Sequence, residues 1–299
     1  MCKKILAAVL VLTMALSVAA CASDSSGETE PSTTGTAATV PSTTTKVDLS
    51  QFETKTLVDT EDMLFQITAI TDDPIWGYTL KAQIENRTDK DLMFTLEDVS
   101  VNGFMCDPYF AATVTAGMKA NKDISFSTDT LEESGIKTVT DIEFALRVYD
   151  SDNWSADDIL EEDFRIYPLG KEAATVQTRQ PQDSDIVLFD NEKCTMVITS
   201  FEPDSIWGYS ALVYLVNKTD DKLMFSVGDA AINGYMCEPY FAQTVAPGKQ
   251  CITRISWSKS ALEGSGITEV ESISLPVRVY DAEDWNAKDL IDETFTVKP

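Results

Sequence analysis

Apolar and polar side chains alternate with a period of two along several short stretches of this chain. The alternation is clear at 63–69 and 78–84, and it returns at 142–149 and 209–215. Because successive side chains of a strand point to opposite faces of a sheet, this period is typical of strands with one buried face. The pattern therefore predicts an all-β fold built from short strands.

The pattern occurs twice because the sequence is duplicated. The motif Ile-Trp-Gly-Tyr at 75–78 recurs at 206–209, and the offset of 131 residues holds without a gap from Leu57 to the end of the chain. About 48 of the 112 aligned positions are identical. A period of this length is too long for a solenoid and fits tandem domains.

The N-terminus resembles a bacterial lipoprotein signal. Lys3 and Lys4 precede an apolar run at 5–16, and Val-Ala-Ala-Cys at 18–21 resembles a lipobox, in which Cys21 is the lipid attachment site. An ordinary secretory signal cut near Ala20 is the alternative. The Ser/Thr/Pro-rich sequence that follows cannot form a core, so we expect a disordered tether.

These features divide the chain into five parts, and each copy has room for about seven strands. The predicted fold class is all-β, with two tandem immunoglobulin-like antiparallel β-sandwiches after a disordered N-terminal tether. The parts are a signal peptide (1–20), the tether (21–55), repeat 1 (56–168), a linker (169–186) and repeat 2 (187–299). Asn-Gly pairs, one in each copy, have the residues of tight hairpin turns.

Each repeat also resembles the telokin-like, immunoglobulin-fold domains of unknown function found in lipoproteins of Gram-positive bacteria. The residues that carry the resemblance are Glu85–Thr88, the strand and turn from Leu92 to Gly103, and the Pro247-Gly248 turn. The first copy departs from the pattern, since Ala116 stands where the second copy has Pro247. The resemblance implies an immunoglobulin fold and a surface location, and it implies no catalytic residues.

Composition narrows the chemistry. The formal net charge is −26, and the chain contains no histidine. A nucleic-acid binder needs a basic surface, so nucleic acid is excluded as a partner. Catalytic triads that use histidine and His-ligated metal sites are excluded as well. We predict no cofactor and no enzyme activity.

Four aromatic residues are candidate partner-binding groups: Trp76 and Trp207, and Tyr109 and Tyr240. They occupy equivalent positions in the two copies, and exposed aromatics dominate many protein interfaces. The alternative for the tryptophans is a buried position that seals one end of each sandwich.

The cysteines allow two interpretations. Cys106 and Cys237 are equivalent, and the sequence favours small buried side chains, with a reactive or interdomain-paired thiol as the alternative. Cys194 and Cys251 occur only in repeat 2, where an exported protein could form a disulfide between them. No paired CxxC spacing predicts zinc.

Two acidic loops, 150–154 and 281–285, offer oxygens to calcium but lack the glycine and closing glutamate of an EF-hand. A solvated turn closed by a packed tryptophan is the favoured interpretation. The predicted function is a non-catalytic binding or scaffolding module on the extracellular face of the cell membrane, anchored through Cys21, with an envelope protein or polymer as partner. The alternatives are an extracellular enzyme with an unrecognised carboxylate or metal site, and a small-ligand sensor or carrier accessory.

Overall fold

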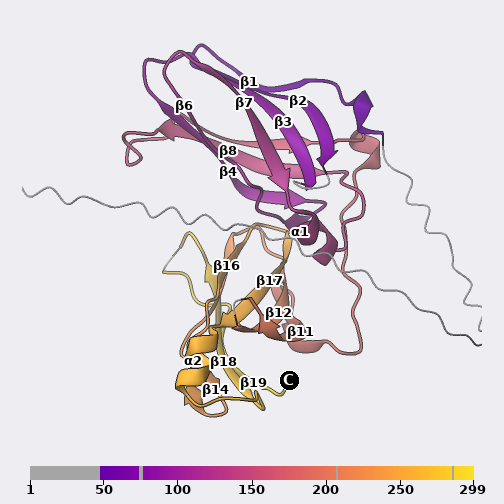
Figure 1. The fold of residues 1–299 in the computed structure, drawn as a ribbon, viewed down its shortest axis with the longest axis vertical. Coiled ribbons are helices and arrows are strands. Elements are labelled where there is room, and N and C mark those ends of the chain that lie inside the picture. The colour runs from indigo at the N-terminus through magenta and orange to yellow at the C-terminus, as the bar shows by residue number, and fades with distance from the viewer. Residues whose placement is uncertain (1–47, 74–76, 207, 285) are drawn as a thin grey trace, which may run out of the picture. The chain divides into compact units, whose positions relative to one another are not determined.

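The computed structural model describes residues 48–73, 77–206, 208–284 and 286–299. The fold is all-β, as the alternation predicts, with antiparallel sheets packed as β-sandwiches (Figure 1). The signal peptide, Cys21 and most of the predicted tether lie outside the described residues. The end of that tether, residues 48–55, contains a 3₁₀ turn at Leu49–Gln51 and the first residue of the first strand.

Repeat 1 forms two sheets. Its elements are β1 (Lys55–Asp59), β2 (Met63–Asp73), β3 (Gly77–Asn86), β4 (Leu92–Val101), β5 (Phe104–Met105), β6 (Ala111–Val114), β7 (Lys119–Phe126), α1 (Thr128–Glu133), β8 (Ile142–Asp150) and β9 (Leu160–Ile166). One sheet has the order β1-β2-β3-β7. In the other, β4 pairs with β5, β6 and β8, and β8 pairs with β9.

Repeat 2 repeats this arrangement, except that two strands, β13 (Leu223–Val227) and β14 (Ala231–Ile232), stand where repeat 1 has the single strand β4, so the duplication in the sequence is also a duplication in the fold. Its elements are β10 (Ile186–Asp190), β11 (Cys194–Ser205), β12 (Gly208–Asn217), β13 (Leu223–Val227), β14 (Ala231–Ile232), β15 (Tyr235–Met236), β16 (Ala242–Val245), β17 (Gln250–Trp257), α2 (Lys259–Gly264), β18 (Ile273–Asp281) and β19 (Ile291–Val297). The strands β10, β11, β12 and β17 correspond to the first sheet of repeat 1. A second 3₁₀ turn, Lys171–Ala173, lies in the linker.

Each repeat has its own hydrophobic core, because the period-two apolar residues of both sheets face inward. In repeat 1 the rings of Phe65 and Phe94 stack with their centroids 6.2 Å apart. In repeat 2 the fully buried Trp257 donates its indole N–H to the carbonyl of Cys237 at 2.8 Å. That bond satisfies the one polar atom that the ring carries into the core.

The Asn-Gly hairpin of repeat 1 is confirmed. Asn102 and Gly103 both have positive φ, at 49° and 85°, and they join Val101 to its partner Phe104 in a two-residue turn. Positive φ at both central positions is the requirement that Asn-Gly meets best. The Asn102 side chain is buried, and its carbonyl oxygen accepts from the backbone N–H groups of Thr140 and Asp141.

The two repeats contact one another within one compact unit, Lys46–Pro299. β5 of repeat 1 pairs in parallel with β17 of repeat 2, where the Gln250 N–H donates to the carbonyl of Gly103 at 3.1 Å. The linker takes part, since the Gln177 N–H donates to the carbonyl of Asn102 at 2.8 Å. The ring of Tyr214 lies 6.2 Å from that of Phe104. The linker is therefore packed against folded structure over this part of its length.

Candidate functional site

The tyrosines singled out from the sequence are among the most exposed large side chains in the described residues. Tyr109 is 70 % exposed and Tyr240 is 74 % exposed. Trp76 and Trp207, the tryptophans of the same prediction, lie outside the described residues. The structure therefore describes the two tyrosines of the four candidate aromatic residues.

The backbone holds each tyrosine in place although its ring is free. The Tyr240 N–H donates to the carbonyl of Ser256 at 2.7 Å, and the Tyr109 N–H donates to that of Ser125 at 2.8 Å. Each residue forms an isolated antiparallel bridge there. The next residue in each copy, Phe110 or Phe241, packs against the core. Because adjacent side chains of extended backbone point in opposite directions, burial of the phenylalanine turns the tyrosine outward.

A cleft of about 880 Å³ lies beside Tyr240. It runs along the outer face of β17, where Ile252, Arg254 and Ser256 alternate, and it ends at the start of α2. Its other lining residues are Thr130, Glu133, Ser205, Ile206, Gly208, Tyr240, Thr253, Ser258, Lys259 and Ser260. Of these, Ile206 is 93 % exposed at the rim. The sequence indicated Tyr240, but it did not indicate that the outer face of β17 lines a cleft beside it.

The depression beside Tyr109 is different. It measures about 500 Å³ and is lined by Pro108, Tyr109, Phe110, Ala111, Lys122 and Asp123, without a serine or threonine. The equivalent of Arg254 in repeat 1 is Asp123, and the equivalent of Ser260 is Asp129. The duplication therefore preserves the tyrosine and changes its surroundings.

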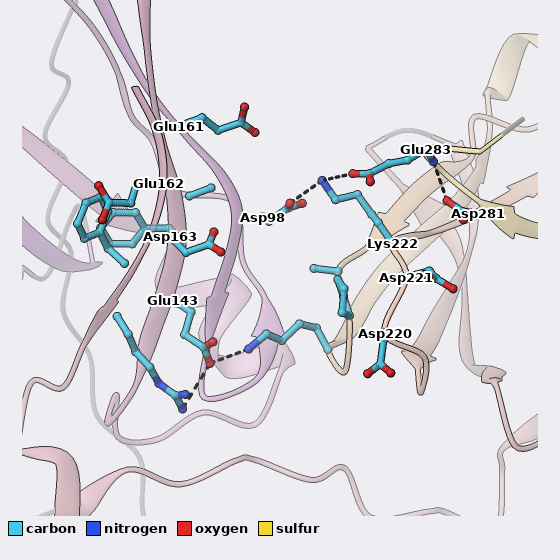
Figure 2. A pocket seen from close by; sticks show the side chains of 17 residues that line it. Asp98, Glu143, Glu161, Glu162, Asp163, Asp220, Asp221, Lys222, Asp281 and Glu283 are labelled. Carbon is cyan, nitrogen blue, oxygen red and sulfur yellow. Dashed lines mark hydrogen bonds and ion pairs between the residues drawn. The ribbon is translucent and has the colours of Figure 1, made fainter. Parts of the chain in front are cut away.

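A second large cleft, of about 710 Å³, is acidic and has residues of both repeats in its lining (Figure 2). Its carboxylates come from β4, β8 and β9 in repeat 1, and in repeat 2 from the loop before β13, the end of β18 and the loop after β18. Lysines of repeat 2 reach across it. The Lys222 ammonium lies 2.6 Å from Asp98, and the Lys249 ammonium lies 2.6 Å from Glu143.

These pairings determine what the acidic cleft offers chemically. Figure 2 shows Lys222 between Asp98 and Glu283, and the carboxylates spread along both walls instead of meeting at one point. No group of three or more Asp, Glu or Cys side chains within the described residues could hold a metal ion. The cleft is best described as an ion-paired seam between the two repeats.

The acidic loops form turns. Asp281 accepts from the backbone N–H groups of Glu283 and Asp284 at 2.8 and 3.2 Å. Asp150 accepts from the Asp152 N–H, and the Lys90 ammonium beside it holds the pKa of its carboxyl below the usual range. The prediction of a packed tryptophan in the first loop is wrong, because Trp154 is 75 % exposed. Trp285 lies outside the described residues.

The Cys194–Cys251 disulfide is not formed, and all four described cysteines are buried free thiols. The two residues lie on β11 and β17, which flank β12: Cys194 pairs with Asn217, and Cys251 pairs with Leu215. Two strand spacings separate them by about 9.5 Å or more, beyond the Cα separation that a disulfide spans. Burial raises the pKa of the Cys106 and Cys251 thiols to about 12, so neither is a nucleophile at neutral pH.

None of the helices within the described residues is both long enough and apolar enough to span a membrane. No protein family matches this sequence, and no curated protein does. Among solved structures, the crystal structure of the YadV chaperone is similar over 74 % of this chain and 92 % of its own, with 11 % sequence identity and a TM-score of 0.20. A likeness at that TM-score carries no argument about the fold or the function of this chain.

Proposed function

We propose that the protein is a lipid-anchored, non-catalytic binding module on the extracellular face of a bacterial cell membrane, built from two tandem immunoglobulin-like sandwiches. The observation that supports the binding role is that Tyr109 and Tyr240 occupy equivalent positions in the two repeats. Each is held by a main-chain bridge and leaves most of its ring in solvent. An exposed aromatic ring on a fixed backbone binds a partner with little loss of conformational entropy.

The immunoglobulin-like assignment is supported by the strand pattern. In each repeat a sheet of four strands packs on a second antiparallel sheet, and the chain passes between the two more than once. Short strands that alternate between two packed sheets are typical of that architecture. The envelope location rests on the N-terminal lipobox and tether, and the partner is an envelope protein or polymer.

Replacing Cys21 tests the anchor. Without the thiol no lipid can be attached, so Cys21→Ser should move the protein from the membrane fraction to the medium or leave an uncleaved precursor. Immunoblots of the membrane fraction and the medium measure the shift. Ala22→Ser, which leaves the thiol intact, is the control. A cleaved Cys21→Ser chain that stays with the membrane would show that the anchor is not a lipid on Cys21.

Replacing the two tyrosines tests the binding role. Residues 46–299 should sediment with isolated envelope material of the source cells, and Tyr109→Ala/Tyr240→Ala should reduce the bound fraction at least about tenfold. Both rings are exposed, so the fold should be unaffected. Tyr235→Ala, which removes a ring that is 57 % exposed away from the bridged positions, should bind normally. Equal sedimentation of all three proteins would refute the proposal.

A further inference from the structure

The cleft beside Tyr240 is lined mainly by neutral hydroxyl groups. They come from Thr130, Ser205, Tyr240, Thr253, Ser256, Ser258 and Ser260. Three serine hydroxyls form a chain in and beside the wall, since that of Ser210 lies 2.9 Å from those of both Ser205 and Ser256. The Ser205 hydroxyl also donates to the carbonyl of Gly208 at 2.8 Å. A hydroxyl can both donate and accept, so the exposed hydroxyl of Tyr240 can bond a ligand in either role.

The cleft's one arginine is already neutralised. Arg254 donates one hydrogen bond through Nε and one through Nη2 to Glu202, and it donates through both Nη atoms to Glu133. Four of its five N–H groups are therefore committed. The two carboxylates are occupied by the same guanidinium. The ion pairs at Arg254 consequently offer neither a free cation for an anionic ligand nor a free carboxylate for a cationic one.

The backbone beside the cleft does not offer a place for a peptide strand. β17 pairs with β12 on one side and with β5 on the other at Gln250. Tyr240 forms the bridge to Ser256 farther along the strand. Because strand addition needs a free edge with unpaired main-chain groups, an extended peptide would find little to pair with here.

From this lining we infer that the cleft binds a neutral oligosaccharide. This inference names a ligand class for the binding module and rests on the binding role proposed above. A sugar ring has an apolar C–H face, which can pack on the exposed ring of Tyr240 and on Ile206. Its rim of hydroxyls matches the serine and threonine hydroxyls of the wall. A volume of about 880 Å³ is in the range of small-ligand sites, so a few sugar residues fit.

Titration calorimetry on residues 46–299 tests the inference. The neutral probes are chitotetraose, cellotetraose and maltotetraose, and tetragalacturonic acid is the charged one. We expect at least one neutral probe to bind with a Kd of about 1 mM or tighter and the charged probe to bind at least about tenfold more weakly. The net charge of −26 disfavours an anion, and the two cations that line the cleft, Arg254 and Lys259, are both paired with glutamates.

Matched variants locate the site. Tyr240→Ala should weaken binding of the neutral probe at least about tenfold, whereas Tyr235→Ala, which removes a ring that is 57 % exposed and does not line the cleft, should change its Kd by less than about twofold. Ile206→Ser should weaken binding as well, and thermal melts should show that all three variants are folded.

Three results would overturn the inference: no heat with any neutral probe at about 10 mM, equal affinity for the charged probe, or unchanged affinity in Tyr240→Ala. Envelope sedimentation separates this failure from a failure of the binding role. If the wild type sediments and the double tyrosine variant does not, the protein is a binder of another ligand class. If the wild type does not sediment, or if the double tyrosine variant sediments as well as the wild type, the binding role itself fails.

Discussion

A Gly208→Ala variant is expected to lose at least about 3 kcal/mol of unfolding free energy. Gly208 has φ of +108°, and a Cβ atom there would lie 2.2 Å from the carbonyl oxygen of Trp257 and 2.6 Å from the backbone nitrogen of Lys259. Both atoms belong to the main chain where β17 passes into α2, so neither can move aside without breaking the local structure. Urea unfolding of residues 46–299 measures the loss.

Gly248→Ala is the matched control. Gly248 also has positive φ, at +66°, but a Cβ atom there would meet nothing within 4 Å. Only the conformational cost of about 1–2 kcal/mol remains. Gly77→Ala should resemble Gly208→Ala, because its Cβ atom would lie 2.2 Å from the carbonyl oxygen of Phe126. Equal losses at Gly208 and Gly248 would show that the close backbone contact does not exist.

An Asn217→Ala variant is expected to lose about 3 kcal/mol. The buried Asn217 amide donates to the carbonyls of Asp221, Val245 and Ala246 at 2.7, 2.9 and 3.2 Å. Its oxygen accepts from the backbone N–H and the hydroxyl of Thr219. Alanine would leave several of these polar groups buried without a partner, which costs more than the hydrogen bonds themselves contribute.

Asn286→Ala, at an exposed position of the same repeat, should change the unfolding free energy by less than about 0.5 kcal/mol. Asn86→Ala should be as harmful as Asn217→Ala, since Asn86 donates to the carbonyls of Lys90 and Val114 in repeat 1. Chemical denaturation reports each value. A loss below about 1 kcal/mol at Asn217 would mean that water replaces the amide.

Two of the differences between the copies are charge reversals that lie at contacts between the repeats. Asp91 of repeat 1 becomes Lys222 in repeat 2, and Asp123 becomes Arg254. In the structure Lys222 pairs with Asp98 and Arg254 pairs with Glu133, both in repeat 1. Each charge reversal therefore places a cation of one copy against an acid of the other. Comparing the copies for charge reversals would have indicated this interface from the sequence.

Local patterns predicted what depends on the backbone alone. The period of two identified the strands and their inward faces, because it follows from the geometry of an extended chain. The Asn-Gly pair identified the turn at Asn102-Gly103, because positive φ limits the residues that fit there. The duplication predicted that each element of repeat 1 would recur in repeat 2, and the strands do recur, with β4 divided into β13 and β14.

Strand order and contacts between distant segments of the chain determined the features that the sequence patterns did not predict. Cys194 and Cys251 are kept apart because β12 lies between their strands. Trp154 is exposed although its loop is held to the neighbouring chain segment by the Ser151 N–H, which donates to the carbonyl of Asp91. The cleft beside Tyr240 is formed by residues far apart in the sequence, from Thr130 to Ser260. Such arrangements depend on which strands pair across the fold, and the periodicity within one strand does not identify the strands that pair with it.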